Sequence, residues 1–105
     1  MDRQADAVFA IQKLVPCLLT VDGEVEPLKS DRPGQPPSLD QLQKWVGGNI
    51  EILPLEIEGQ DRFVMVVDEE AKLKTSALPN VLASFQYKHS DILGPAVICA
   101  DSWIE

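Results

Sequence analysis

The spacing of hydrophobic residues changes several times along the chain, and each spacing predicts a different kind of element. Near the start, Val8, Ile11 and Leu14 recur at helical intervals. This pattern predicts a short helix over residues 2–14, although the two residues that follow Val8 also permit a strand. Pro16 would end the helix, because proline cannot continue the helical hydrogen-bond ladder.

The next two apolar runs predict a β-hairpin, with strands over residues 17–21 and 24–28. Asp22 and Gly23 lie between them. This dipeptide is a typical signal of a type I′ turn, which needs a positive φ at both central residues. Pro27 has no amide hydrogen to donate, so we expect the second strand to end at Pro27 or to lie at an edge of the sheet.

A proline-rich loop and a short amphipathic helix come next. Residues 29–37 contain three prolines and a glycine, and we expect them to be mobile or extended. Ser38 lies three residues before Gln41, as in a capping box, where each side chain accepts the amide hydrogen of the other residue. The apolar residues of the helix form one stripe, which consists of Leu39, Leu42, Trp45 and Val46.

Gly47 and Gly48 separate this helix from the next apolar run. Glycines that bind phosphate lie before a helix, where free amides and the positive end of the helix dipole converge. Gly47 and Gly48 lie at the opposite, carbonyl end, where a glycine in the left-handed conformation commonly closes a helix. We therefore interpret the pair as structural, with a phosphate-binding loop as the alternative.

Two more strands are predicted after the glycines. Apolar residues alternate from Ile50 to Ile57, but the alternation shifts by one at Leu53 and Pro54. Such a shift predicts a bulge or bend in the strand. The unbroken apolar run 63–67 is the best candidate for the central strand of the sheet.

The last third of the chain predicts short elements joined by turns. Residues 72–75 are expected to form a short strand, and Asn80 is a suitable N-cap for a short helix. The apolar residues of that helix are Val81, Leu82 and Phe85. Residues 96–100 form the predicted closing strand, and we expect Trp103 and Ile104 to cover an edge of the sheet.

Together these elements predict an α+β fold, with a mainly antiparallel sheet of about five strands and two or three short helices on one face. A chain of 105 residues has room for one domain. We therefore expect residues 1–105 to form a single domain.

The net charge of the chain limits the kinds of partner that we expect. The chain has 9 lysines and arginines against 17 aspartates and glutamates, which gives a net charge of −8. The basic residues are dispersed, so direct binding to nucleic acid is disfavoured. No apolar run approaches the about 18 residues of a membrane span, and the start of the chain does not resemble a secretory signal. We expect a cytoplasmic protein that is a monomer or a small homo-oligomer.

The residues that carry most enzyme chemistry are scarce. Cys17 and Cys99 both lie in apolar stretches, so we expect them to be core residues. The only histidine, His89, lies in a polar stretch, which favours a surface position over a place beside a nucleophile. A zinc site needs about four cysteine or histidine ligands, and the chain has three such residues. No nucleotide-binding signature is present, so we expect neither a metal nor a cofactor.

Carboxylates and one asparagine are the remaining candidates for a binding site. The acidic residues form two groups, Glu51, Glu56 and Glu58 on one predicted strand and Asp68, Glu69 and Glu70 after another. Paired carboxylates can act as acid and base or bind Mg²⁺, but alternating glutamates are also typical of the solvated face of a strand. Asn80 can cap its helix or bind a ligand there, and capping is the favoured interpretation.

Four stretches of the sequence resemble a known family. They are L-Q-x-x-V-G-G-x-I-E at residues 42–51, VVDEEAKLK at 66–74, LPN at 78–80 and DILGPAVI at 91–98. In this order they resemble an uncharacterised family of small domains of unknown function, found in phage, plasmid and actinobacterial accessory proteins. The resemblance covers residues 16–100 and implies a setting in mobile elements but no catalytic residue. This chain departs from the family pattern by an N-terminal extension (1–15), the long proline-rich loop (29–37) and Pro95.

These observations lead to three hypotheses of function. The first is a non-enzymatic, acidic accessory protein that binds a larger host protein with a basic surface and modulates or inhibits it. The alternative is a small-ligand protein that binds or sequesters a nucleotide. An enzyme is the least favoured hypothesis.

Overall fold

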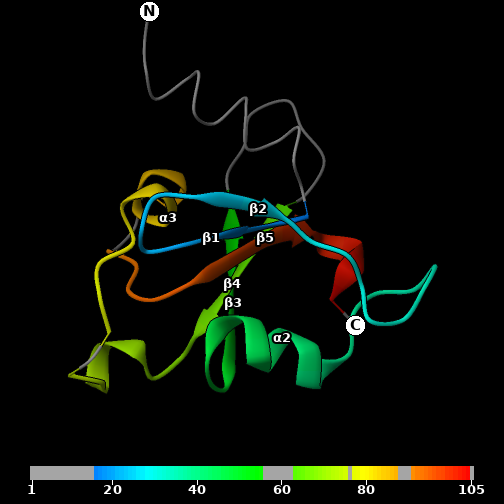
Figure 1. Cartoon of the computed structure of the whole chain (residues 1–105), viewed down its shortest axis with the longest axis horizontal. Coiled ribbons are helices and arrows are strands. Elements are labelled where there is room, and N and C mark those ends of the chain that lie inside the picture. The colour runs from blue at the N-terminus through cyan, green and yellow to red at the C-terminus, as the bar shows by residue number, and fades with distance from the viewer. Residues whose placement is uncertain (1–15, 56–62, 76, 88–90, 105) are drawn as a thin grey trace, which may run out of the picture.

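A five-stranded antiparallel sheet organises the part of the chain that the structure describes (Figure 1). The computed structural model describes residues 16–55, 63–75, 77–87 and 91–104. The strand order is β2-β1-β5-β4-β3, and the strands are β1 Cys17–Leu19, β2 Val25–Pro27, β3 Ile50–Leu55, β4 Phe63–Asp68 and β5 Ala96–Ala100. The predicted α+β class and antiparallel sheet are confirmed.

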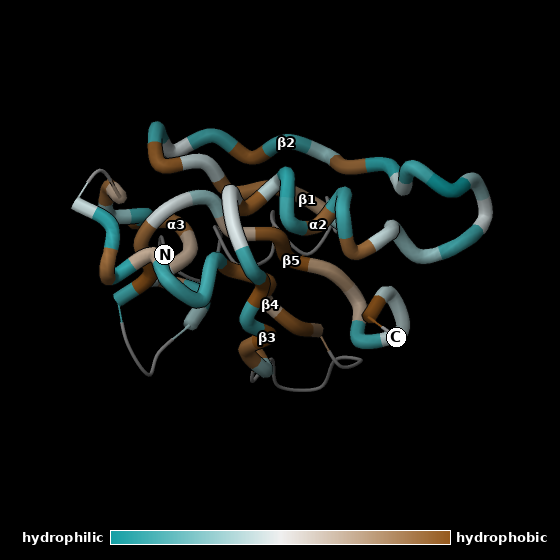
Figure 2. Tube along the Cα trace, turned by 90° about the horizontal axis from the view of Figure 1, so that it is seen from below, coloured by the Kyte–Doolittle hydropathy of each residue, from teal (hydrophilic) through white to brown (hydrophobic). Residues whose placement is uncertain are grey.

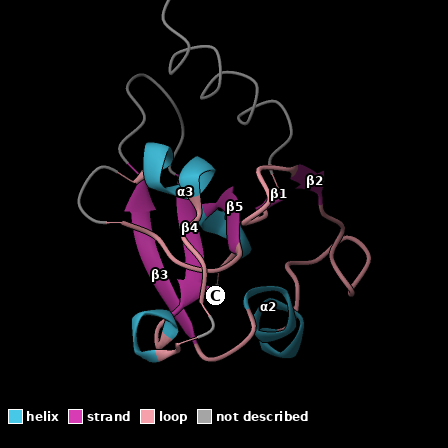
Figure 3. Ribbon diagram, turned by 60° about the vertical axis from the view of Figure 1, so that its left-hand side comes forward, coloured by secondary structure: helices cyan, strands magenta, loops and turns pink. Residues whose placement is uncertain are grey.

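Two α-helices and two 3₁₀ turns are also described, namely α2 Leu39–Val46, α3 Val81–Gln86, η1 Ala71–Leu73 and η2 Asp101–Trp103. Successive side chains of β4 point to opposite faces of the sheet. Met65 packs into a cluster that includes Ala83 of α3. Val66 packs into a second cluster that includes Val46 of α2. The helices therefore cover opposite faces rather than one face as predicted, and they lie apart in Figure 3.

β4 and β5 are the most deeply buried strands because both of their faces are covered. Residues 64–68 of β4 and residues 96–99 of β5 are all buried. Figure 2 shows hydrophobic residues along these two strands and mostly hydrophilic residues in the loop after β2. β5 holds the middle position of the sheet, so the apolar run predicted to be central lies beside the centre.

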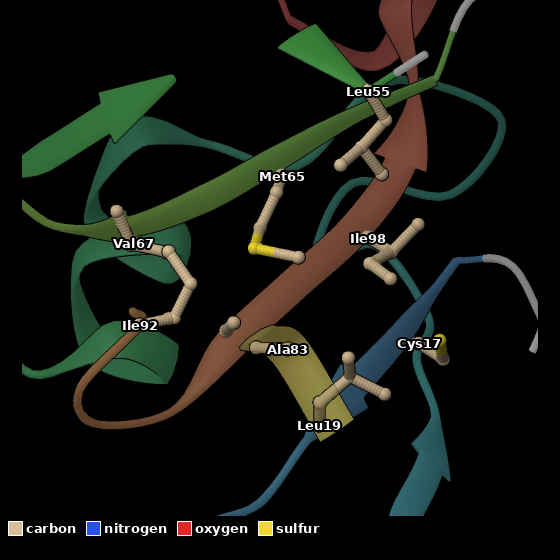
Figure 4. Packing of buried hydrophobic residues seen from close by; sticks show 9 residues of the cluster. Cys17, Leu19, Leu55, Met65, Val67, Ala83, Ile92 and Ile98 are labelled. Atoms are coloured by element: carbon tan, nitrogen blue, oxygen red, sulfur yellow. The ribbon is translucent and has the colours of Figure 1, made fainter. Parts of the chain in front are cut away.

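The cluster on the α3 side brings together β1, β3, β4, β5 and α3 (Figure 4). Met65 lies near the middle of its labelled residues, and its side chain is fully buried. Ala83 is also fully buried, and its small side chain lets α3 lie directly against the sheet. Burial of each large side chain here stabilises the fold by about 1.5–3 kcal/mol.

The β1–β2 hairpin closes through a different turn from the predicted one. Gly23 has a φ of 89°, but among the described residues only glycines have a positive φ, so Asp22 cannot complete a type I′ turn. Instead, the Gly23 amide donates to the Thr20 carbonyl oxygen at 3.1 Å, and the Thr20 amide donates to the Glu24 carbonyl oxygen at 2.9 Å. A type I turn followed by a left-handed glycine is a common three-residue hairpin loop.

α2 begins at the predicted cap, although the capping box is only half formed. Ser38 Oγ accepts the Gln41 amide at 3.2 Å. The Ser38 amide and hydroxyl donate to the two carboxylate oxygens of Asp31, at 2.9 and 2.7 Å. These bonds from Ser38 lower the pKa of Asp31. The bonds between Ser38 and Asp31 tie residues 29–37 back onto the start of the helix. Arg32 also donates to two carbonyl oxygens within this loop.

β3 runs without the predicted bulge. It pairs with β4 in one continuous register along its whole length. Pro54 is tolerated because β3 is an edge strand, whose outer side needs no partner. The apolar pattern shifts because Ile50 packs on the α2 side, whereas Leu53 and Leu55 pack on the α3 side.

Four further predictions concern single elements. Residues 71–73 form η1, so the strand predicted over 72–75 is wrong. Leu39 is 55% exposed and does not belong to the buried stripe of α2. Trp103 and Ile104 are half-buried and pack against the α2-side cluster. The helix predicted over 2–14 lies outside the described residues.

Candidate functional site

Asp68, the last residue of β4, is the centre of a polar junction between distant parts of the chain. Its side chain is 5% exposed and forms an ion pair with Lys74 Nζ. Its Oδ1 also accepts the Glu70 amide at 2.9 Å. Lys74 Nζ donates in addition to the Gly47 carbonyl oxygen at 3.0 Å. Lys74 thus links the carboxylate to the negative end of α2, which favours a nearby cation.

The two glycines after α2 meet different requirements at this junction. Gly47 has a φ of 88° and closes the helix in the left-handed conformation, as a C-terminal glycine commonly does. Gly48 makes room for Asp68, because a Cβ atom at Gly48 would lie 2.8 Å from Asp68 Oδ1 and 2.9 Å from its Cγ. No heavy atom lies within 4 Å of the corresponding position at Gly47. Backbone strain therefore favours glycine at position 47, and the lack of space for a side chain favours glycine at position 48.

The structural interpretation of the glycine pair is confirmed by the hydrogen bonds of their amides. The Gly47 and Gly48 amides both donate to the Gln43 carbonyl oxygen, at 2.8 and 3.1 Å. A phosphate-binding loop needs amides that point toward the ligand at the start of a helix. Here they complete the end of α2, so the alternative of a phosphate loop is wrong.

Two opposing effects act on the carboxyl group of Asp68. Burial raises its pKa, but the hydrogen bond from Lys74, the Glu70 amide and the positive charge of Lys74 together lower the pKa below its usual value. We therefore expect Asp68 to be ionised at neutral pH. A carboxylate that is held in this state by a neighbouring ammonium group is poorly prepared to act as a general acid or base near pH 7.

Next to this junction lies a concavity of about 390 Å³, whose lining includes Asp68 and residues of the α3-side cluster. Its floor is apolar and includes Val67 and Ile92. Its polar residues are Glu51, Asp68, Glu69, Lys72, Tyr87 and Asp91. We call this concavity the acidic concavity, because four of these six side chains carry carboxylates and one carries an amine.

Comparison with known proteins identifies the family. The model of a family described as a domain of unknown function (DUF3846) matches residues 17–103. The chain belongs to this family. No curated protein and no solved structure matches the chain. The DUF3846 match includes all the described strands and helices, and with them both glycines and the acidic concavity.

The DUF3846 fold brings together three of the six carboxylates proposed from the sequence. Glu51 from β3 and Glu69, the residue after β4, are exposed and line the acidic concavity with Asp68. Glu70 is exposed but lies outside the lining, where it contributes its amide to Asp68. The other two proposed residues, Glu56 and Glu58, lie outside the described residues.

Asn80 has the capping role that was the favoured interpretation. Its Oδ1 accepts the Ala83 amide at 3.0 Å at the start of α3. Its Nδ2 donates to the carbonyl oxygens of Leu19 and Gly94, at 2.9 and 2.8 Å. The side chain is fully buried and therefore joins α3, β1 and the turn before β5 instead of facing a ligand.

Three further polar residues of the acidic concavity were missed by the sequence analysis. Lys72 lies in η1, Tyr87 follows α3, and Asp91 precedes the isolated bridge between Pro79 and Leu93. They come from separate stretches of chain, and no local spacing connects them. The contact of Lys74 with Gly47 was missed for the same reason, since 27 residues separate the two.

Cys17 and Cys99 are core residues, as predicted. Burial raises the pKa of Cys17 to about 11 and, together with Cys17 and Asp101, that of Cys99 to about 12. The two side chains lie in different clusters, on opposite faces of the sheet. Both thiols are therefore protonated at neutral pH and poor nucleophiles. His89 lies outside the described residues.

No group of three or more histidine, cysteine, aspartate or glutamate side chains is arranged to hold a metal ion among residues 16–55, 63–75, 77–87 and 91–104. In the same part of the chain, no helix has the length and apolar character that a membrane crossing requires.

Proposed function

We propose that this DUF3846 protein is a non-enzymatic binding protein that engages a basic surface of a larger protein. The observation that carries the proposal is the acidic concavity, where three exposed carboxylates, Glu51, Glu69 and Asp91, outnumber one lysine, Lys72, beside an apolar floor of buried residues. Asp68 adds little net charge because Lys74 neutralises it. An apolar floor with a carboxylate rim suits the side chain of an arginine or lysine, which has an apolar stem and a charged end.

The net charge of the whole chain supports the same partner class. A charge of −8 attracts basic surfaces over distances of about 10 Å at ordinary salt concentrations. It repels the phosphate backbone of nucleic acids, so direct nucleic-acid binding is not part of the proposal. A basic partner that itself binds nucleic acid would be blocked by the domain, which is the form of inhibition that we propose.

The proposed setting is an accessory protein of a phage or plasmid that acts in the cytoplasm. Its support is the resemblance of the V-G-G-x-I-E and LPN stretches to proteins of mobile elements. A non-enzymatic role is supported by the ionised, lysine-bound Asp68 and by the protonated thiols of Cys17 and Cys99. None of these groups is poised for acid–base or nucleophilic chemistry at neutral pH.

Affinity capture with charge variants tests the proposal. The immobilised domain is exposed to host lysate at salt concentrations of about 0.1 M and about 1 M, between which the Debye length falls from about 10 to about 3 Å. We expect a basic protein to be retained at the lower concentration and released at the higher one. The double variant Glu51→Gln and Glu69→Gln should retain much less of it.

The double variant Glu26→Gln and Asp40→Asn is the matched control, because it also removes two exposed carboxylates, one on β2 at the other edge of the sheet from β3 and one on α2. It does not touch the acidic concavity and should retain the partner. Retention that is insensitive both to salt and to the concavity variants would contradict the proposal.

A small-ligand protein is the second candidate, and the size of the acidic concavity supports it. A volume of about 390 Å³ falls within the range of about 300–1,000 Å³ that is usual for ligand sites. A thermal-shift screen with nucleotides tests this candidate, since a ligand at about 100 times its Kd stabilises the fold by about 2.7 kcal/mol. The carboxylate rim disfavours an anion, so we expect no shift, and a clear shift would favour this candidate over the first.

A further inference from the structure

An unusual arrangement of apolar side chains lies next to the acidic concavity. Val81 and Phe85 are four residues apart in α3, so they lie on the same side of the helix. They are 62% and 45% exposed, whereas Ala83 on the inner side is fully buried. α3 therefore packs against the sheet with one side and presents a second apolar surface to solvent.

These side chains form one wall of a second concavity, also of about 390 Å³. It is lined by Pro79, Val81, Ser84, Phe85, Asp91 and Leu93, and we call it the α3 groove. Leu78 is 59% exposed just before Pro79 and extends the apolar character of this region. Contiguous exposed apolar surface of this kind commonly marks a site of interaction.

The α3 groove and the acidic concavity are neighbours, because Asp91 and Leu93 line both. Apolar surface therefore passes directly into a mainly carboxylate rim, which includes Glu51 and Glu69 and one lysine, Lys72. A purely apolar occupant would leave this rim unused, and a purely basic one would leave Val81 and Phe85 exposed. An occupant satisfies both charge complementarity and hydrophobic burial only if it carries basic and apolar side chains together.

We propose that the α3 groove and the acidic concavity form one docking site for a partner segment that has apolar side chains next to arginine or lysine side chains. The apolar side chains lie against Val81 and Phe85, and the basic ones reach Asp91, Glu51 and Glu69. This inference rests on the proposed function and specifies the chemistry of the partner. The apolar contact contributes affinity, and the carboxylates contribute orientation and rate of association.

Binding of synthetic peptides to the full chain tests the docking site. The probe is a peptide of about ten residues, with leucines in one half and arginines in the other. Extended, it is about 33 Å long, comparable with the molecule's dimensions of 39 × 37 × 21 Å. Two matched peptides replace either the leucines by serine or the arginines by glutamate. We expect the first peptide to bind at least about tenfold more tightly than either control.

Substitutions in the domain assign the two halves of the site. Val81→Ser and Phe85→Ser should each weaken the leucine–arginine peptide about tenfold and leave the serine–arginine peptide unchanged. Leu39→Ser is the control, because Leu39 is similarly exposed but lies on α2, on the other face of the sheet. The double variant Glu51→Gln and Glu69→Gln should weaken both arginine peptides and reduce their salt dependence. Circular dichroism verifies that each variant is folded.

The outcomes separate this inference from the proposed function. Equal binding of the leucine–arginine and serine–arginine peptides, with an effect of the carboxylate variants, would overturn the docking site and leave the acidic binding function intact. If the double variant Glu51→Gln and Glu69→Gln bound the arginine peptides as tightly as the wild type, both the docking site and the proposed function would be overturned. Absence of peptide binding would also overturn the docking site. Two other results would overturn the docking site, because another occupant would then hold the groove. One is concentration-dependent dimerisation that Val81→Ser abolishes. The other is a change in the amide chemical shifts of residues 1–15 when Val81→Ser is introduced into the free protein.

Discussion

At the scale of single residues, neighbouring glycines have different physical roles. Gly47 is needed for its φ of 88°, and Gly48 for the space that Asp68 occupies. The sequence predicted the first role, because a glycine after a helical pattern is a local signal. It did not predict the second, because Asp68 is 20 residues further along the chain and only the pairing of β3 with β4 brings it close.

The two roles predict different behaviour of alanine variants. Gly48→Ala should lower the free energy of unfolding by about 1–3 kcal/mol, because its Cβ displaces a carboxylate held by Lys74. The loss should be smaller in an Asp68→Ala background, where the space is open. Gly47→Ala should cost about 1–2 kcal/mol in either background, because its strain is a property of the backbone. Urea unfolding of the single and double variants measures both, and equal losses for Gly48→Ala in the two backgrounds would contradict this role of Gly48.

The ion pair between Asp68 and Lys74 predicts a pH dependence of stability. The pKa of Asp68 is lowered in the folded protein, so its carboxylate stabilises the fold above the unfolded value of about 3.9. That contribution is lost as the pH falls through the folded pKa. Asp68→Asn should therefore unfold at lower urea concentration than the wild type near neutral pH, and the difference should shrink below about pH 4. A difference that stays constant down to the acid limit of folding would argue against this pair as the cause.

At the scale of elements, the stability of α3 depends more on the side chain of Asn80 than on the helix propensity of the residues in α3. The helix has six residues, too few to be stable alone. Asn80 ties it to β1 through Leu19 and to the turn before β5 through Gly94. The cap was predictable from the sequence, but the two long-range bonds were not, since Leu19 lies 61 residues away.

This arrangement predicts unequal effects of removing the two helix caps. Asn80→Ala should cost about 2–4 kcal/mol, because it removes the cap and leaves two buried carbonyl oxygens without their donor. Ser38→Ala at α2 should cost about 1 kcal/mol, since its surroundings reach solvent. Urea midpoints of the two variants compare these losses directly. Equal losses would show that Asn80 acts only as a cap.

The strands show which parts of the fold the sequence could predict. The run 63–67 was correctly predicted as a strand, because five consecutive apolar residues that include three valines are too short for a buried helix and rich in β-branched side chains. The same run also indicates burial on both faces, and this was the available signal that helices cover both sides. The shift at Pro54 was misinterpreted as a bulge. In a strand whose two faces meet different clusters, apolar residues can change sides without any change of register.

At the scale of the whole molecule, two hydrophobic clusters share the same two strands. Met65 and Ile98 belong to the α3-side cluster, and Val66 and Val97 belong to the α2-side cluster. Loss of packing on one face would leave β4 and β5 half exposed. We therefore expect the two faces to unfold together as one cooperative unit.

Cys17 and Cys99 report on the two faces separately, because they lie in different clusters. The variants Cys99→Ala and Cys17→Ala each leave one thiol, which a thiol reagent can modify only after the protein opens. Native labelling should be slow even near pH 8.5, since both pKa values are raised, to about 11 for Cys17 and about 12 for Cys99. In increasing urea, the labelling of each variant should rise at that variant's own midpoint for loss of circular dichroism. Labelling of Cys99 well below that midpoint, with Cys17 still protected, would show that the α2 face opens by itself and that the clusters do not form one unit.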